Sequence, residues 1–103
     1  MAGLFTESIC SLLESVPSGR VVTYGRLAAE AGSPRAARQV VRILHTQSRI
    51  RGLPWHRVVA AGGRIALQDD GGELQRSLLA SEGVDIGIDG RVDLEEYGWE
   101  FDE

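Results

Sequence analysis

The three residues Gly32-Ser33-Pro34 lie between two segments with helical spacing, and they constrain the fold more than any other part of the chain. Before them, Thr23 is placed to cap a helix that ends at Gly32, because glycine readily adopts the left-handed conformation that closes a helix. After them, Ser33 and Pro34 supply an N-cap and a first-turn proline for a helix that continues to about His45. Two helices joined by so short a turn are typical of a helix-turn-helix.

Helical spacing also marks the N-terminus and defines two faces of the third helix. Apolar residues recur from Phe5 to Val16, after a Thr6 that can serve as N-cap, and they predict a first helix. In the third helix, a rotation of about 100° per residue separates arginines from apolar side chains. The arginine face consists of Arg35, Arg38 and Arg42, and the apolar face consists of Ala37, Val40, Val41 and Leu44.

The second half of the chain changes pattern. Residues 57–60 and 64–67 flank Gly62-Gly63, which is a hairpin signal, and residues 72–81 predict a last helix. The residues of that helix expected to point inward are Leu74, Leu78 and Leu79, and Gly83 is expected to end it. The chain therefore predicts a mainly α fold with a small β-hairpin, a winged-helix-like helix-turn-helix domain.

Charge is distributed unevenly along the 103 residues, although the net charge is only −4. Residues 1–19 carry −2, residues 20–57 carry eight arginines against one glutamate, a net of +7, and residues 58–103 carry −9. A basic block inside an acidic chain is the footprint of an anionic partner such as nucleic acid. All eleven basic residues are arginine, so forked phosphate contacts are available.

Length and composition exclude several classes of protein. A chain of 103 residues, 43% hydrophobic, fits one domain over 1–103, with a core over 4–84 and an acidic C-terminal tail over 85–103 that packs in part. It has no apolar run of about 18 residues that would span a membrane, no secretory signal, and only one cysteine, Cys10. We expect a soluble cytoplasmic monomer, nucleoid-associated if bacterial, with no metal and no cofactor.

The arginine face of the third helix has two interpretations, a solvated helix face or a surface that enters a DNA groove. The surrounding basic block favours the groove. Phosphate contacts would come from Arg20, Arg26 and either Arg49 or Arg51. Gln39 is the only amide at the helix start that can pair with adenine in a major groove, and the small Ala36 and Ala37 suit close approach to a shallow groove.

Four short motifs follow one another along the chain. They are Val21-Val22-Thr23-Tyr24-Gly25-Arg26-Leu27-Ala28, Gly32-Ser33-Pro34-Arg35-Ala36-Ala37-Arg38-Gln39-Val40, Pro54-Trp55-His56-Arg57-Val58-Val59 and Leu78-Leu79-Ala80-Ser81-Glu82-Gly83. In this order and spacing they resemble the DNA-binding and active-site domain of the O6-alkylguanine-DNA alkyltransferases, over about residues 4–84. The repair enzymes have Pro-Cys-His-Arg-Val in the third motif, and their cysteine takes the alkyl group. Trp55 occupies that position here, so the chain most closely resembles the alkyltransferase-like proteins.

The exchange of cysteine for tryptophan removes the chemistry of repair. Dealkylation needs a polarizable nucleophile such as a thiolate activated by a neighbouring histidine, and an indole cannot replace it. Cys10, the only thiol, is expected to be a packing residue. His56 and Glu82 match the family's histidine and glutamate, and without the thiol we expect them to form a structural hydrogen-bonded pair.

The resemblance implies a lesion-binding protein whose helix-turn-helix enters the minor groove. Arg38 would fill the gap left by an extruded nucleotide, and Tyr24 would press the phosphate and turn the base outward. The implied DNA-binding residues are Thr23, Tyr24, Arg26, Ser33, Pro34, Arg35, Ala36, Ala37, Arg38, Gln39 and Arg42. The implied lesion pocket consists of Tyr24, Gln47, Trp55, Val58, Gln68 and Asp69. Gln68-Asp69-Asp70 departs from the Tyr-Ser-Gly of the repair enzymes, and Tyr97 and Trp99 are alternative residues to close over the lesion.

Three functions remain open at this point. A suicide alkyltransferase is disfavoured by Trp55, and a winged-helix transcription regulator is disfavoured by the scarcity of base-reading side chains on the third helix. We favour a non-enzymatic sensor that binds O6-alkylguanine in double-stranded DNA by base flipping. The resemblance further implies that nucleotide excision repair proteins receive the lesion.

Overall fold

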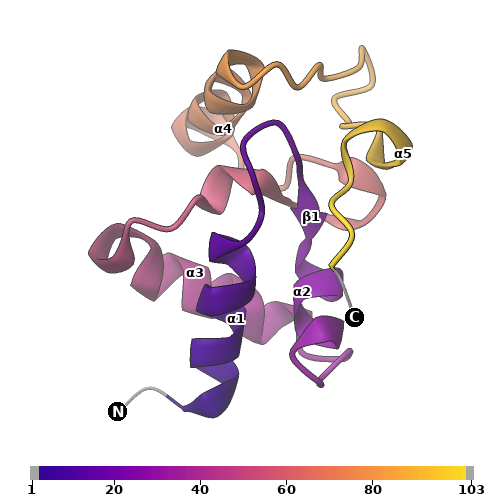
Figure 1. Ribbon diagram of the computed structural model, residues 1–103. Coiled ribbons are helices and arrows are strands. Elements are labelled where there is room, and N and C mark those ends of the chain that lie inside the picture. The colour runs from indigo at the N-terminus through magenta and orange to yellow at the C-terminus, as the bar shows by residue number, and fades with distance from the viewer. Residues whose placement is uncertain (1–2, 102–103) are drawn as a thin grey trace.

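The computed structural model describes residues 3–101, so the outermost residues of the expected domain and tail, 1–2 and 102–103, lie outside the described part (Figure 1). The elements, in order, are α1 (Leu4–Glu14), β1 (Val22–Thr23), α2 (Tyr24–Glu30), α3 (Ala37–Arg51), the 3-10 helix η1 (Trp55–Arg57), β2 (Val58–Val59), the 3-10 helix η2 (Ala61–Gly63), α4 (Asp69–Ser81) and α5 (Leu94–Tyr97). None of these helices is long and apolar enough to cross a bilayer.

The first three helices pack against one another around the larger of two apolar clusters (Figure 1). Its buried members include Ile9, Leu13, Val16, Leu27, Val40, Ile43, Leu44, Leu53, Val58 and Phe101. The smaller cluster lies under α4 and the C-terminal segment and consists of Val21, Val59, Ile65, Leu79, Val84 and Val92. Val22 of β1 and Val58 of β2 belong to the larger cluster, whereas Val21, just before β1, and Val59 of β2 belong to the smaller one. The two strands therefore lie between the two clusters.

The helix-turn-helix is present, with both ends of α2 as expected and both ends of α3 different from those expected. The Oγ1 of Thr23 accepts the N–H of Arg26 at 3.0 Å, and Gly32 has a φ of +91°, so the start and the stop of α2 are confirmed. Ser33 does not cap α3, because its carbonyl accepts the N–H of Ala36 at 2.9 Å in a separate turn. α3 therefore begins only at Ala37.

α3 also ends later than the sequence analysis expects. It continues past His45 to Arg51 and stops at Gly52, which has a φ of +64°. No glycine or proline interrupts the chain before that residue, so nothing ends the helix earlier. Val41, expected in the core, is 45% exposed, and Ile43 is buried in its place. The inward face is rotated because α1 and α2 both pack on the side of Ile43.

The two strands form a parallel sheet, and the expected hairpin is wrong. Val22 lies opposite Val58, and Thr23 lies opposite Val59. Residues 60–64 do turn tightly, but the chain after the turn forms only an isolated bridge, between Arg64 and Arg91. β2 pairs with β1 instead because that pairing places valines from both strands in the core. The fold remains mainly helical with a small sheet.

α4 starts at Asp69, three residues before its expected start, and turns a different face inward. Leu79 is fully buried, but Leu74 is 52% exposed and Gln75 is buried in its place. The Thr6 cap expected for α1 is also wrong, since that helix begins at Leu4 after Gly3. Gly83 has a φ of +85°, which agrees with its expected role in ending α4.

The acidic tail packs against the rest of the domain, as expected in part. Val21 donates its N–H to the carbonyl of Tyr97 at 2.9 Å and accepts the N–H of Trp99 at 2.8 Å. Val92 and Phe101 are buried, whereas Ile88 is fully exposed. Tyr97 and Trp99 are thus bonded alongside Val21 through their backbones.

Candidate nucleic-acid interface

The helix-turn-helix presents an exposed surface that starts in the turn and continues along α3. Its exposed members are Ser33, Pro34, Arg35, Arg38, Gln39 and Arg42, and the half-buried Ala36 and Ala37 lie among them. The small alanines leave the backbone at the start of α3 close to the surface. A duplex can therefore approach this helix end closely while arginines surround the contact.

The eight arginines of the basic block divide into paired and unpaired groups. Arg51 forms a forked pair with Glu7, Arg57 binds Glu82, and Arg20 donates to the carbonyl of Glu96 at 2.9 Å. Arg26 lies 3.2 Å from Glu30 and 3.8 Å from Glu100. Of these eight, the four with no ion pair and no side-chain hydrogen bond to residues 3–101 are Arg35, Arg38, Arg42 and Arg49. These four are exposed and available to phosphates.

A groove of about 790 Å³ lies between α3, the start of α2, η1 and the start of α4. It is lined by Tyr24, Val41, Leu44, His45, Ser48, Arg49, Gly52, Leu53, Trp55, Leu67, Gly71 and Leu74. Tyr24 and Trp55 are among these residues, and half of the remaining lining residues are valine or leucine. A mostly apolar groove with a few polar groups suits a planar heterocycle better than a charged ligand.

Of the residues expected to form the lesion pocket, Tyr24 and Trp55 line this groove and the other four do not. Val58 is fully buried in β2. The side chain of Gln47 accepts the Nε–H of Arg51 at 2.9 Å on another face of α3. Gln68 and Asp69 are exposed where α4 begins, and Leu67 and Gly71 on either side of them line the groove instead.

The groove residues of α3 were not predicted from the sequence. Val41, His45, Ser48 and Arg49 follow the spacing of one helix face, which is the signal that could have found them. Ending the helix at His45 hid that face. The Oγ of Ser48 is buried and has no hydrogen-bond partner within residues 3–101.

Trp55 is the first residue of η1 and is half-buried at the groove. Its backbone N–H donates to the carbonyl of Leu53 at 2.8 Å. The rings of Trp55 and His56 meet edge to face, with centroids 6.1 Å apart and planes at 85°. The indole of Trp55 therefore contacts the His56 ring, and it also lines the groove.

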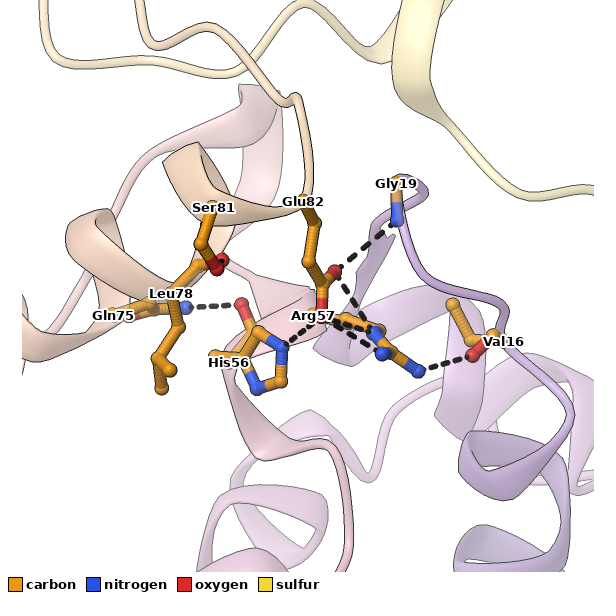
Figure 2. A network of polar contacts seen from close by, with 8 residues as sticks. All are labelled: Val16, Gly19, His56, Arg57, Gln75, Leu78, Ser81 and Glu82. Carbon is orange, nitrogen blue, oxygen red and sulfur yellow. Dashed lines mark hydrogen bonds and ion pairs between the residues drawn. The ribbon is translucent and has the colours of Figure 1, made fainter.

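A polar network lies directly behind this turn (Figure 2). His56 Nε2 and Glu82 Oε2 are 2.7 Å apart, so the structure brings this pair together. Arg57 donates to both oxygens of Glu82 and, through Nη1, to the carbonyl of Val16 at 2.9 Å. The N–H of Gly19 donates to Glu82 Oε1 at 3.1 Å. The network joins the end of α4, η1 and the loop after α1.

The electrostatics of the network keep Glu82 ionised. Burial alone raises the pKa of this carboxyl, but hydrogen bonds from Arg57, His56 and the N–H of Gly19 outweigh burial and hold the pKa at about 2. Burial raises the pKa of the Tyr24 hydroxyl, so that side chain stays neutral in the groove. Burial likewise raises the pKa of Cys10, which is 2% exposed and does not line the groove.

Comparison with known proteins gives matches over most of the chain. Residues 4–84 match the family described as the 6-O-methylguanine DNA methyltransferase, DNA binding domain. The chain is 41% identical over 97 residues to the DNA base-flipping protein of Escherichia coli (strain K12), covering 94% of this chain and 75% of that protein. It is 36% identical over 102 residues to Alkyltransferase-like protein 1 of Schizosaccharomyces pombe, covering 90% of this chain and 88% of that protein.

Solved structures give the same answer. The crystal structure of S. pombe Atl1 in complex with damaged DNA containing O6-carboxymethylguanine matches with a TM-score of 0.82 and 33% identity. That match covers 97% of this chain and 99% of the Atl1 chain. The likeness therefore extends beyond residues 4–84 into the C-terminal segment.

Proposed function

The chain belongs to the family of the 6-O-methylguanine DNA methyltransferase DNA-binding domain, as an alkyltransferase-like protein, and on this premise we propose that it senses alkylated guanine in duplex DNA without repairing it. The protein binds O6-alkylguanine after the damaged nucleotide has been rotated out of the duplex. It leaves both the base and itself chemically unchanged.

One observation carries the proposal: Trp55 lines the groove at the position where the resemblance places the alkyl-accepting cysteine. An indole offers a flat surface for stacking, and such stacking is worth about 1–3 kcal/mol per base. Extruding a base costs a few kcal/mol, and least for a base that pairs poorly. Stacking on Trp55 therefore offsets much of the flipping cost, and a damaged guanine is favoured over an intact one.

The absence of a usable thiol supports binding without alkyl transfer. Cys10 is the only cysteine in the sequence. It is buried in α1, and burial raises its pKa, so it is not a thiolate at neutral pH. His56 is bonded to Glu82, and the residue before it is Trp55, which has no thiol to activate.

In the proposed complex, α3 lies in the minor groove of the duplex. The unpaired Arg35, Arg42 and Arg49 contact phosphates, which position the duplex without reading its sequence. Arg38 enters the base stack where the nucleotide has left. Tyr24, the first residue of α2, lies between that helix and the groove and guides the base inward.

Binding without repair has a use only if another system removes the lesion. The proposed partners are the proteins of nucleotide excision repair, which excise a damaged segment irrespective of the chemistry of the adduct. The protein acts in this scheme as a marker that stays on the lesion. Recruitment of excision proteins to a lesion duplex in the presence of this chain, and not in its absence, tests this step.

The binding step is tested by one mixing experiment. The protein is incubated with a duplex containing O6-methylguanine and with the same duplex containing guanine, the two affinities are measured, and both molecules are then weighed. We expect tighter binding to the lesion and unchanged masses. A gain of about 14 Da on the protein, one methylene, would show alkyl transfer, and strong preference for one undamaged sequence would show a transcription regulator.

A further inference from the structure

Gln75 is the one buried polar side chain in the part of the chain that the structure describes, with 1% of its surface exposed. It lies in the middle of α4, on the face that meets η1. Buried amides are uncommon unless their hydrogen bonds are needed. The partners of this amide therefore indicate what it does.

The side chain of Gln75 crosses from α4 to the turn that follows Trp55 (Figure 2). Its Nε2 donates to the carbonyl of Val58 at 2.8 Å and to the carbonyl of His56 at 3.1 Å. A side-chain amide has two N–H donors, so both are used. The two carbonyls lie on either side of Arg57, and one amide thus spans the end of η1 and the start of β2.

These bonds fix the backbone that presents the indole. On one side of Trp55, its N–H is bonded to the carbonyl of Leu53. On the other side, the His56 carbonyl is bonded to Gln75 and the His56 ring is bonded to Glu82. The neighbour of Gln75 in α4, Leu74, lines the same groove. α4 therefore supplies both a lining residue of the groove and the hydrogen bonds that fix the turn after Trp55.

We infer that Gln75 is a positioning residue, which holds the turn after Trp55 so that the indole is fixed as a stacking surface before DNA arrives. The inference rests on the proposed function. A surface that is already fixed loses less conformational entropy on binding. This smaller entropy cost affects binding only when a base stacks on the surface. The amide therefore acts on the binding of flipped bases and leaves the binding of intact duplex unchanged.

The test uses Trp99→Phe as background, because the chain has two tryptophans and this change leaves Trp55 as the only one. Three variants replace the amide: Gln75→Met has no donors, Gln75→Glu keeps the shape but offers only acceptors when ionised, and Gln75→Lys keeps donors. Glu73→Met is the control, an exposed polar residue changed to methionine on the same helix. Each protein is measured for affinity to lesion and plain duplexes and for acrylamide quenching of Trp55.

We expect Gln75→Met and Gln75→Glu to lose roughly 3- to 10-fold in affinity for the lesion duplex, as expected for one or two hydrogen bonds. Affinity for the plain duplex stays unchanged, and quenching of Trp55 increases. Gln75→Lys recovers part of the lesion affinity and lowers the quenching again. Thermal unfolding of each variant identifies any that do not fold, and the remaining variants then decide the result.

Failure of the positioning role of Gln75 can be distinguished from failure of the proposed lesion binding. If the unmodified chain shows no preference for the lesion duplex, the proposed function fails. If that preference is present and folded Gln75→Met and Gln75→Glu keep it in full with unaltered quenching, the positioning role is overturned. Equal losses on both duplexes, or a Gln75→Lys variant as weak as Gln75→Met, would assign the effect to packing and also overturn it.

Discussion

Glu82 accepts hydrogen bonds from Arg57 through both of its carboxylate oxygens, with nitrogen to oxygen distances of 3.1 Å to Oε1 and of 2.8 Å and 3.2 Å to Oε2. Only 13% of the Glu82 side chain is exposed. The pair links Glu82, at the end of α4, to the turn that carries Trp55. The stability of the domain and the shape of the groove are therefore linked through one carboxylate.

The first prediction concerns acid stability. The pKa of Glu82 is about 2 in the folded protein and 4.5 ordinarily, so the unfolded chain binds a proton first as the pH falls. The stabilisation is present in full above pH 4.5 and is lost progressively down to about pH 2. It amounts to about 3 kcal/mol, from 1.36 kcal/mol per pKa unit. Chemical denaturation across this pH window measures it.

Glu82→Gln is the matched control for that titration. This variant keeps the shape of the side chain but cannot ionise, so its stability is lower at pH 7 and falls less between pH 4.5 and 2. A variant with the same pH dependence as the unmodified chain would place the titration on other carboxylates.

The second prediction concerns Trp55. Trp55→Ala removes the stacking surface, and we expect a loss of about 1–3 kcal/mol in binding to an O6-alkylguanine duplex with little change on plain DNA. Paired titrations of the two duplexes measure the difference. A similar loss on both duplexes would show that the indole supports the fold and does not contact the base.

Trp55→Cys tests whether the position alone supplies repair. His56 and Glu82 are already bonded beside it, but Gln68 and Asp69 do not line the groove. We therefore expect little or no methyl transfer from O6-methylguanine DNA, measured by intact mass. Efficient transfer by this variant would show that the residues at the start of α4 are unimportant for the chemistry.

The third prediction concerns salt. If Arg35, Arg42 and Arg49 meet phosphates, the logarithm of the affinity falls with the logarithm of the salt concentration at a slope of about −2.7, or −0.9 per contact. Arg42→Gln makes this slope less steep by about 0.9, the value of one contact. Arg51→Gln leaves the slope unaltered, because Arg51 is already paired with Glu7. A slope near zero would mean that the basic block faces a different partner.

The fourth prediction separates Arg38 from its neighbours. Arg35→Ala and Arg42→Ala should weaken lesion and plain duplexes proportionately, since each loses one phosphate contact. Arg38→Ala should lose about 1–3 kcal/mol mainly on the lesion duplex, because its contact exists only after a base has left the stack. Fluorescence of 2-aminopurine beside the lesion should then report less unstacking. Equal losses for all three variants, with unchanged fluorescence, would remove the intercalating role.

Local signals in the sequence predicted both ends of α2, the first helix of the helix-turn-helix. The Thr23 cap and the Gly32 stop were predictable because each depends on one residue and its own backbone. The parallel pairing of Val22 with Val58 was not, because it depends on two segments far apart in the chain, whereas the glycines between 60 and 64 favour a local hairpin. Nothing in the pattern of residues 58–59 shows which strand they pair with.

The groove was predictable only where a motif marked it. Tyr24 and Trp55 followed from the motifs, and both line the groove. His45 and Ser48 were missed because the face of a helix can be read only over its full length, and α3 extends to Arg51. Gln75 was missed because a glutamine on a helix is ordinarily exposed, and only the position of η1 makes this one buried.

Val21 bonds the C-terminal segment through Tyr97 and Trp99, while the two residues after it pair with β2. Because synthesis starts at the N-terminus, the arginines of α3 are made before residues 97–101, at a stage when the larger apolar cluster still lacks Phe101. We expect that surface to acquire its fixed geometry late, when the segment from Val92 to Phe101 arrives. The last part of the chain to be made thus completes the apolar cluster on which α3 packs.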